Sequence, residues 1–139
     1  MKKLINALKN NKADQYIQFI ICTVIGIVLV VSVMSLGTLY VQKVWLNDKL
    51  SDMSRIISVT GSYKDAEIYA IEDEVIDKLG GSFSYSGDIL DTASGKVQLG
   101  SVVKINYKTE IAVFSIGDAV INADVDLNKN AISEVYFKE

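Results

Sequence analysis

The feature that most constrains this chain is a long uncharged run near its N-terminus. Between Asp14 and Lys43 lie 28 residues without a single charge, and the run is almost wholly apolar from Phe19 through Val33. A bilayer core is about 30 Å thick, and a helix needs about 20 apolar residues to cross it. One segment meets this requirement and no later segment does, so the sequence predicts one membrane-spanning helix at residues 14–42.

Charge is distributed unevenly on the two sides of this run. Residues 1–13 form a basic leader with four lysines, whereas residues 43–139 carry 10 Lys/Arg against 16 Asp/Glu. Because positive flanks stay in the cytoplasm, we expect a single-pass protein of the cell membrane with a cytoplasmic leader and an exported domain. The acidic balance of that domain argues against nucleic-acid binding, which requires clustered Lys/Arg for phosphate contacts.

Few residues in the chain could carry chemistry. The sequence has no histidine, and its one cysteine, Cys22, lies inside the predicted span. The exported domain therefore has no disulfide of its own, and the commonest general base and metal ligand are missing. We find no Gly-rich phosphate loop, serine elbow or metal-ligand spacing. We expect a non-enzymatic protein without catalytic residues, a metal or another cofactor.

One acidic pattern invites a calcium interpretation. Asn122, Asp124, Asp126 and Asn128 alternate along one predicted strand. The EF-hand pattern fails, however, because Lys129 stands where that loop requires glycine. We therefore expect a solvated strand face, paired across the sheet with Lys104 and Lys108. Similarly, we expect the acidic residues of the second helix to form its solvated face rather than an acid–base site. These residues are Glu72, Asp73, Glu74 and Asp77.

Beyond the span the hydrophobic pattern predicts two helical segments. Apolar residues recur at spacings of four, three and four, so the membrane helix should continue to about Val59. These residues are Leu46, Leu50, Met53 and Ile57. A second helix is predicted from Tyr63 or Lys64 to Leu79, where Gly80-Gly81 should end it.

After Gly81 the period changes to two, which predicts strands with one buried face. The predicted strands are 97–107, 110–116, 119–127 and 132–138, with Ser82–Tyr85 as a short fifth. The predicted turns between them are Lys108-Thr109, Gly117-Asp118 and Asn128–Asn130. Short connections favour an antiparallel meander. The sequence therefore predicts an α+β domain at residues 43–139, in which both helices cover one face of a 4–5-stranded antiparallel sheet.

Two segments carry a family resemblance. Residues 13–21, Ala-Asp-Gln-Tyr-Ile-Gln-Phe-Ile-Ile, together with Leu50–Gly61, resemble type IV pilins and pseudopilins. The nearer resemblance is to TadE-like pseudopilins and a related family of uncharacterised proteins in Gram-positive mobile elements. In TadE-like proteins a small residue precedes the cleavage point and a Val-Glu-Phe-like triplet opens the apolar run. Ile17-Gln18-Phe19 occupies that place here. The resemblance implies a pilin-like fold and leader cleavage between Ala13 and Asp14.

The chain departs from the pilin pattern at two positions. Pilin leaders usually end in glycine, and Ala13 stands there; the acidic residue five places beyond the cut is Gln18. In pilins that carboxylate is thought to pair with the freed amine of a neighbouring subunit, and a neutral amide loses this Coulomb attraction. The departures leave three alternatives: incorporation through another contact, a minor or initiating subunit, or a chain that is never cleaved.

Small residues in the span suggest where it packs. Cys22 and Gly26 are one turn apart, a small-xxx-small spacing that lets helices approach closely. With Gln18 and Phe19 they are the candidate residues for helix packing and assembly.

These patterns lead to one leading function and one alternative. The leading function is a pilin-like or pseudopilin-like subunit of a pilus, secretion or conjugation assembly, in the membrane or extracted into a surface filament. Its partners would be the lipid bilayer, further copies or sister pilins, and, by resemblance, a prepilin-type peptidase and a membrane platform. The alternative is an uncleaved, monomeric binding or sensor module that the helix tethers to the membrane.

Overall fold

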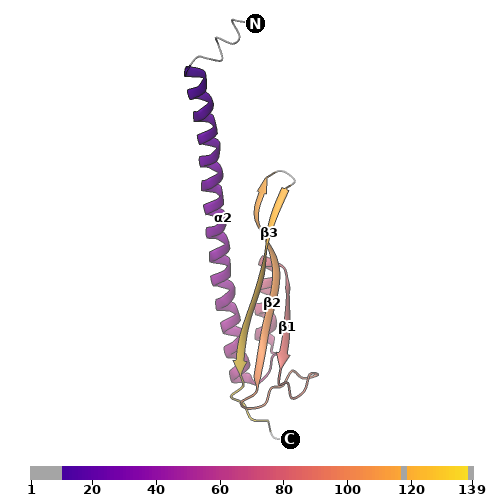
Figure 1. Ribbon diagram of the computed structural model, residues 1–139. Helices are drawn as coiled ribbons and strands as arrows, with labels where there is room; N and C mark the ends of the chain where they lie inside the picture. Colours follow the sequence, from indigo (N-terminus) through magenta and orange to yellow (C-terminus); the bar gives the residue numbers. More distant parts are fainter. Residues whose placement is uncertain (1–10, 117–118, 138–139) are drawn as a thin grey trace. The chain divides into compact units, whose positions relative to one another are not determined.

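The computed structural model describes residues 11–116 and 119–137 and has the α+β class that the sequence predicts (Figure 1). Its elements are α2 (Asn11–Thr60), α3 (Ala66–Leu79), β1 (Ser82–Gly87), β2 (Val102–Ile116) and β3 (Ala119–Ile132). The chain divides into two compact units, Met1–Thr38 and Leu39–Glu139, and α2 contributes residues to both. The first unit holds most of the uncharged run, and the second holds the domain.

Helix α2 ends where the sequence places a glycine. The Gly61 N–H donates to the Ile57 carbonyl at 2.8 Å, and Gly61 has a φ of +66°. A Cβ at this position would lie 2.8 Å from Cε2 of Phe137, so glycine is required by both conformation and space. The predicted break after Val59 is therefore confirmed, with the last helical residue at Thr60.

Helix α3 is confirmed, and its start is set by a cap. The Asp65 side chain accepts a hydrogen bond from the Glu67 N–H at 3.0 Å, so the helix begins at Ala66 rather than at Tyr63 or Lys64. At the other end the Gly80 N–H donates to the Ile76 carbonyl at 2.8 Å. Gly80 has a φ of +69°, a conformation that glycine adopts without strain.

The described strands form one antiparallel sheet in the order β1-β2-β3. The predicted turn at Lys108-Thr109 is wrong, because β2 runs through it without interruption. The alternation of faces continues there: Tyr107 and Thr109 are buried, and Lys108 is exposed. The Thr109 hydroxyl donates to the Leu79 carbonyl at 2.8 Å, which holds this part of the strand against the end of α3.

The predicted turn at Asn128–Asn130 is also wrong. These residues pair with Asn106, Ile105 and Lys104 inside the β2–β3 ladder. The predicted strand 132–138 is wrong over residues 133–137, where Ser133 and Phe137 bond to the Val97 carbonyl and the Gln98 side chain instead of a ladder.

Two further differences concern the number of strands. Residues 97–101 precede β2 without joining it. The described part of the sheet therefore has three strands instead of four or five. The predicted Gly117-Asp118 turn lies outside the described residues.

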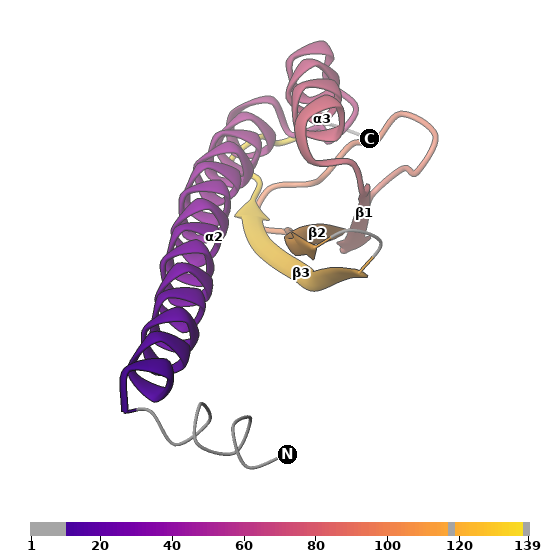
Figure 2. The ribbon, with the colours of Figure 1, turned by 90° about the horizontal axis from the view of Figure 1, so that it is seen from above.

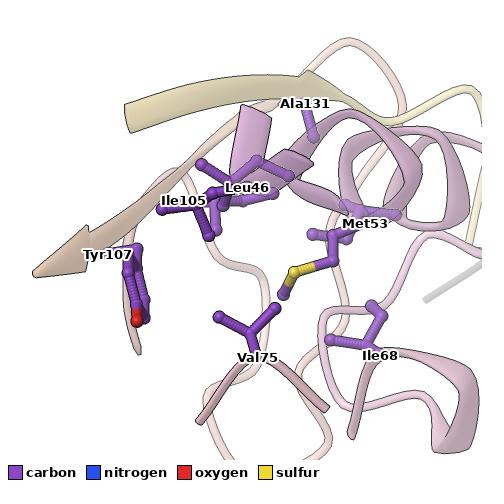
Figure 3. Close-up of a cluster of buried hydrophobic side chains, with 9 residues drawn as sticks. Leu46, Met53, Ile68, Val75, Ile105, Tyr107 and Ala131 are labelled. Atoms are coloured by element: carbon purple, nitrogen blue, oxygen red, sulfur yellow. The ribbon is translucent and has the colours of Figure 1, made fainter. Parts of the chain in front are cut away.

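The core of the domain lies between the two helices and one face of the sheet, as the pattern predicts. Figure 3 shows side chains from α2, α3, β2 and β3 pointing toward one another, and Figure 2 shows both helices on the same side of the strands. Each core residue is at most 1 % exposed: Leu46, Leu50, Met53, Ile57, Ile68, Val75, Ile105, Tyr107 and Ala131. Four of the nine come from α2, so this helix is the largest single contributor to the core.

A truncation in this core tests the arrangement. We expect Leu50→Ala to lower the free energy of unfolding by about 2–5 kcal/mol, because Leu50 is 1 % exposed and its removal leaves a cavity. The matched control is Leu99→Ala, at a position that is 54 % exposed, which should change stability by less than about 0.5 kcal/mol. Urea unfolding of the full chain in detergent, followed by Trp45 fluorescence, measures both. Equal effects of the two changes would contradict the packing.

Candidate functional site

The four residues predicted to mediate assembly lie on one face of α2. Gln18, Cys22 and Gly26 follow each other at four-residue spacing, and Phe19 is adjacent on the same stripe. Gln18, Phe19 and Cys22 are exposed, and a Cβ built at Gly26 would meet nothing within 4 Å. The described residues of this chain therefore leave the face uncovered. The predicted cleavage bond, Ala13–Asp14, lies in the first turns of the same helix.

A second glycine extends this face. Gly37 follows Gly26 by eleven residues, which is close to three full turns, so both glycines lie on one side of the helix. A Cβ at Gly37 would also meet nothing within 4 Å. A neighbouring helix could therefore approach the backbone closely at two levels of α2.

The serine and threonine hydroxyls of the uncharged run bond to their own helix. Its four Ser/Thr residues each donate to the carbonyl four positions earlier, at 2.7–3.1 Å; the pairs are Thr23–Phe19, Ser32–Val28, Ser35–Val31 and Thr38–Met34. A hydroxyl that is satisfied in this way needs no water and no partner chain. Among the described residues, α2 is the one helix long and apolar enough to cross a membrane, judged by length and composition.

Within the domain, Glu74 of α3 joins the two helices by ion pairs. Its carboxylate lies 2.6 Å from Lys49 Nζ of α2 and 3.1 Å from Lys78 Nζ one turn along α3. The hydrogen bond from Lys49, followed by the one from Lys78, lowers the pKa of Glu74. Both ammonium groups also lie over the Trp45 ring, Lys78 at 4.4 Å and Lys49 at 5.7 Å from its centroid.

Glu72 of α3 makes a different contact. The Tyr85 hydroxyl of β1 donates to its carboxylate, and the Tyr85 ring stacks on Tyr63 with centroids 4.9 Å apart. Burial raises the pKa of Glu72 by more than the hydrogen bond from Tyr85 lowers it, and the neighbouring Asp73 adds a smaller increase. Burial and the neighbouring Glu72 carboxylate raise the pKa of Tyr85 far above its usual value, so the phenol remains a donor.

These contacts correct the expectation that all four acidic residues of α3 form a solvated face. Asp73 and Asp77 are exposed, but Glu72 and Glu74 are half-buried in the contacts just described. The sequence held a signal for this difference. Glu72 follows the buried Ile68 by four residues, which places it at the edge of the apolar stripe.

The acidic face of β3 is solvated, as predicted. Asn122, Asp124, Asp126 and Asn128 are all exposed, and Asp126 Oδ2 lies 3.3 Å from Lys108 Nζ on β2. Lys104, the other expected partner, lies opposite Asn130. In residues 11–116 and 119–137, no group of three or more acidic or cysteine side chains is arranged to hold a metal ion.

Comparison of this chain with protein-family models, with curated proteins and with solved structures gives no match.

The two half-buried glutamates should act on stability with opposite signs as pH changes. The folded-state pKa of Glu74 lies below its ordinary value of 4.5, so its contribution is present above that value and is lost as pH falls through the folded pKa. The folded-state pKa of Glu72 lies above 4.5, so its contribution is present below that value and is lost as pH rises through the folded pKa.

We therefore expect opposite changes from two matched substitutions. The quantity to compare is the increase in the free energy of unfolding when pH is raised from about 3 to about 7. This increase should be smaller in Glu74→Gln than in the parent chain, and larger in Glu72→Gln than in the parent chain. Glutamine keeps the acceptor for Tyr85, so the second change isolates the charge. Urea unfolding of the full chain in detergent at the two pH values measures both. Changes of the same sign would show that the two carboxylates do not have the environments described.

Proposed function

We propose that this protein is a non-enzymatic, membrane-anchored, pilin-like subunit of a pilus, secretion or conjugation assembly. The observation that supports this proposal most strongly is the double use of α2. Residues 15–42 of α2 are uncharged, with mostly exposed apolar side chains, and its last part supplies four of the nine core residues of the domain. A helix of this kind anchors a domain and is also part of it.

In this proposal, assembly occurs through the helix face of Gln18, Phe19, Cys22 and Gly26. Small residues let a neighbouring helix approach closely, and dispersion contacts then stabilise the pair. The same surface suits lipid and a bundle of like helices, because α2 satisfies its backbone groups internally in both environments. Extraction of the subunit from the bilayer into a filament would therefore exchange one apolar environment for another.

The remaining parts of the proposal follow from charge and resemblance. The basic leader would stay in the cytoplasm and the acidic domain would stand outside the cell. Prepilin-type peptidase, sister pilins and a membrane platform are the partners that the resemblance implies. Because Gln18 replaces the usual carboxylate, incorporation would depend on helix packing rather than on an ion pair with a freed amine.

The alternative function, an uncleaved monomeric tether for a binding module, is favoured by one observation in the domain. Tyr63, Tyr69, Phe83 and Tyr85 line an open hollow of about 370 Å³ beside Glu72, a place where a small ligand could lie on aromatic rings. The intact mass of the native protein separates the two functions, since a start at Asp14 supports the pilin-like subunit and a retained Met1 supports the tether.

The helix-packing surface can be tested through the one cysteine. In native membranes, mild oxidation should link two chains through Cys22, because a symmetric contact at this face brings the two thiols together. Gly26→Leu should lower the yield of linked dimer several-fold by separating the helices. Non-reducing electrophoresis measures the yield.

The matched control moves the thiol to the opposite side of the helix. In Cys22→Ser/Val24→Cys the cysteine is rotated by about 200° around α2, so the yield should fall several-fold. Equal linkage at positions 22 and 24 would indicate random collisions of monomers. That result, or no linkage at either position, would contradict assembly through this face.

A further inference from the structure

The far end of the β2–β3 hairpin is a ribbon of two strands to which no third described strand is added. β1 pairs with β2 only as far as Lys108, whereas β2 pairs with β3 as far as Ile116 and Ala119 (Figure 1). We use "ribbon" for Thr109–Ile116 together with Ala119–Val125, which are joined by seven cross-strand pairs. Its two outer edges carry backbone groups without a strand partner among the described residues.

The polar face of the ribbon continues the solvated face of β3 through Asp124 and ends at Asn122. Its charged residues stop at the facing pair Glu110 and Asp124, and segments 111–117 and 119–123 contain no charge. Side chains alternate between the two faces of a strand, so the consecutive residues Val120 and Ile121 lie on opposite faces. They are 53 % and 60 % exposed. Apolar surface is therefore open to the surroundings on both sides.

Contacts inside the domain give the direction of the ribbon. Two positions along α2 can be matched with positions along the sheet. At the first position, the Ser54 hydroxyl of α2 donates to the Asn130 carbonyl of β3 at 2.9 Å. At the second position, the Thr109 hydroxyl of β2 donates to the Leu79 carbonyl of α3. Leu79 in turn lines a hollow together with Gln42 and Trp45 of α2, so Thr109 lies near this part of α2.

The distance between these two positions is about the same along β3 as along α2. From Asn130 to Val125, the partner of Thr109, β3 rises by about 17 Å, and from Ser54 to Gln42 α2 rises by about 18 Å. The strands therefore run along α2 toward the end of its uncharged run, and the ribbon continues past Thr109 in that direction.

We propose that the ribbon inserts into the polar–apolar boundary of the membrane leaflet from which α2 emerges. This proposal rests on the membrane anchoring proposed above. The partner is a lipid surface, because the uncharged end of the ribbon exposes the apolar side chains of Val120 and Ile121 on opposite faces and extends toward the level at which α2 would leave the bilayer. Its unpaired edge groups need water, and the sequence has Asp118 between the two strands, so insertion stays shallow.

The experiment uses the full chain in phosphatidylcholine vesicles whose lipids carry bromine, a quencher of tryptophan, either near the headgroup or near the chain end. Trp45 is the one native tryptophan, so Trp45→Phe gives a silent background. Ile121→Trp reports on the ribbon, with Val120→Trp as a second probe. Tyr136→Trp, at a position that is 69 % exposed in the C-terminal segment, is the control outside the ribbon. Leu29→Trp tests anchoring.

We expect bromine near the headgroup to quench both ribbon probes several-fold more than Tyr136→Trp, and more than bromine at the chain end does. Aqueous acrylamide should quench them several-fold less than the control. If Leu29→Trp is quenched by lipid but the ribbon probes are not, the ribbon proposal is wrong and the anchoring stands. Shielding from acrylamide would then indicate a protein partner such as a second copy. If Leu29→Trp is not quenched either, the proposed function fails as well.

Discussion

The packing of the C-terminal part of α2 against α3 and the sheet is the interaction on which the domain depends. A three-stranded sheet with one apolar face needs a cover, and α3 supplies only Ile68 and Val75 to the fully buried set. α2 supplies four residues to that set, from Leu46 to Ile57. Without them the buried faces of β2 and β3 would be open to water, so the helix proposed as the anchor is also required for folding.

This double use of one helix explains how polar groups are arranged along it. In the uncharged run the hydroxyls bond to carbonyls of the same helix and leave an apolar surface. From Trp45 onward two side chains also bond to other elements, Lys49 to Glu74 and Ser54 to the Asn130 carbonyl. Other hydroxyls there, those of Ser51, Ser58 and Thr60, still donate to carbonyls of α2. The change separates a surface suited to lipid or like helices from a surface suited to a folded domain.

The sequence predicted well those features that depend on strong periodicity and on glycine. The four-three-four spacing from Leu46 to Ile57 identified the buried stripe of α2, and Gly61 and Gly80 marked the ends of both helices. The alternation around Val103, Ile105 and Tyr107 identified the inner face of β2. These signals are local, so a single chain carries them without knowledge of its partners.

The two wrong turn predictions fall on polar residues inside strands. Lys108-Thr109 and Asn128–Asn130 look like turns in a list of residues, but each keeps the inside–outside alternation, and neither contains the glycine or proline that commonly marks a tight turn. The contact of Tyr85 with Glu72 joins β1 to α3, and no spacing along the chain predicts it. Helical periodicity alone predicts that the candidate assembly residues share one side of α2. The uncovered ribbon depends instead on the end of β1–β2 pairing at Lys108, which is a tertiary feature.

An accessibility scan along α2 tests whether one helix both spans the membrane and forms the core of the domain. A nitroxide would be placed in turn at positions 14–60 of the Cys22→Ser chain in vesicles, and its collisions with oxygen and with a water-soluble nickel complex measured. We expect nickel exclusion on all faces of α2 across the apolar run. Past Trp45, the collision rates with both reagents should vary with the period of a helix. They should be lowest at Leu46, Leu50, Met53 and Ile57. Nickel access within the apolar run, or the absence of that period beyond Trp45, would contradict a single helix that both spans the membrane and forms the core of its domain.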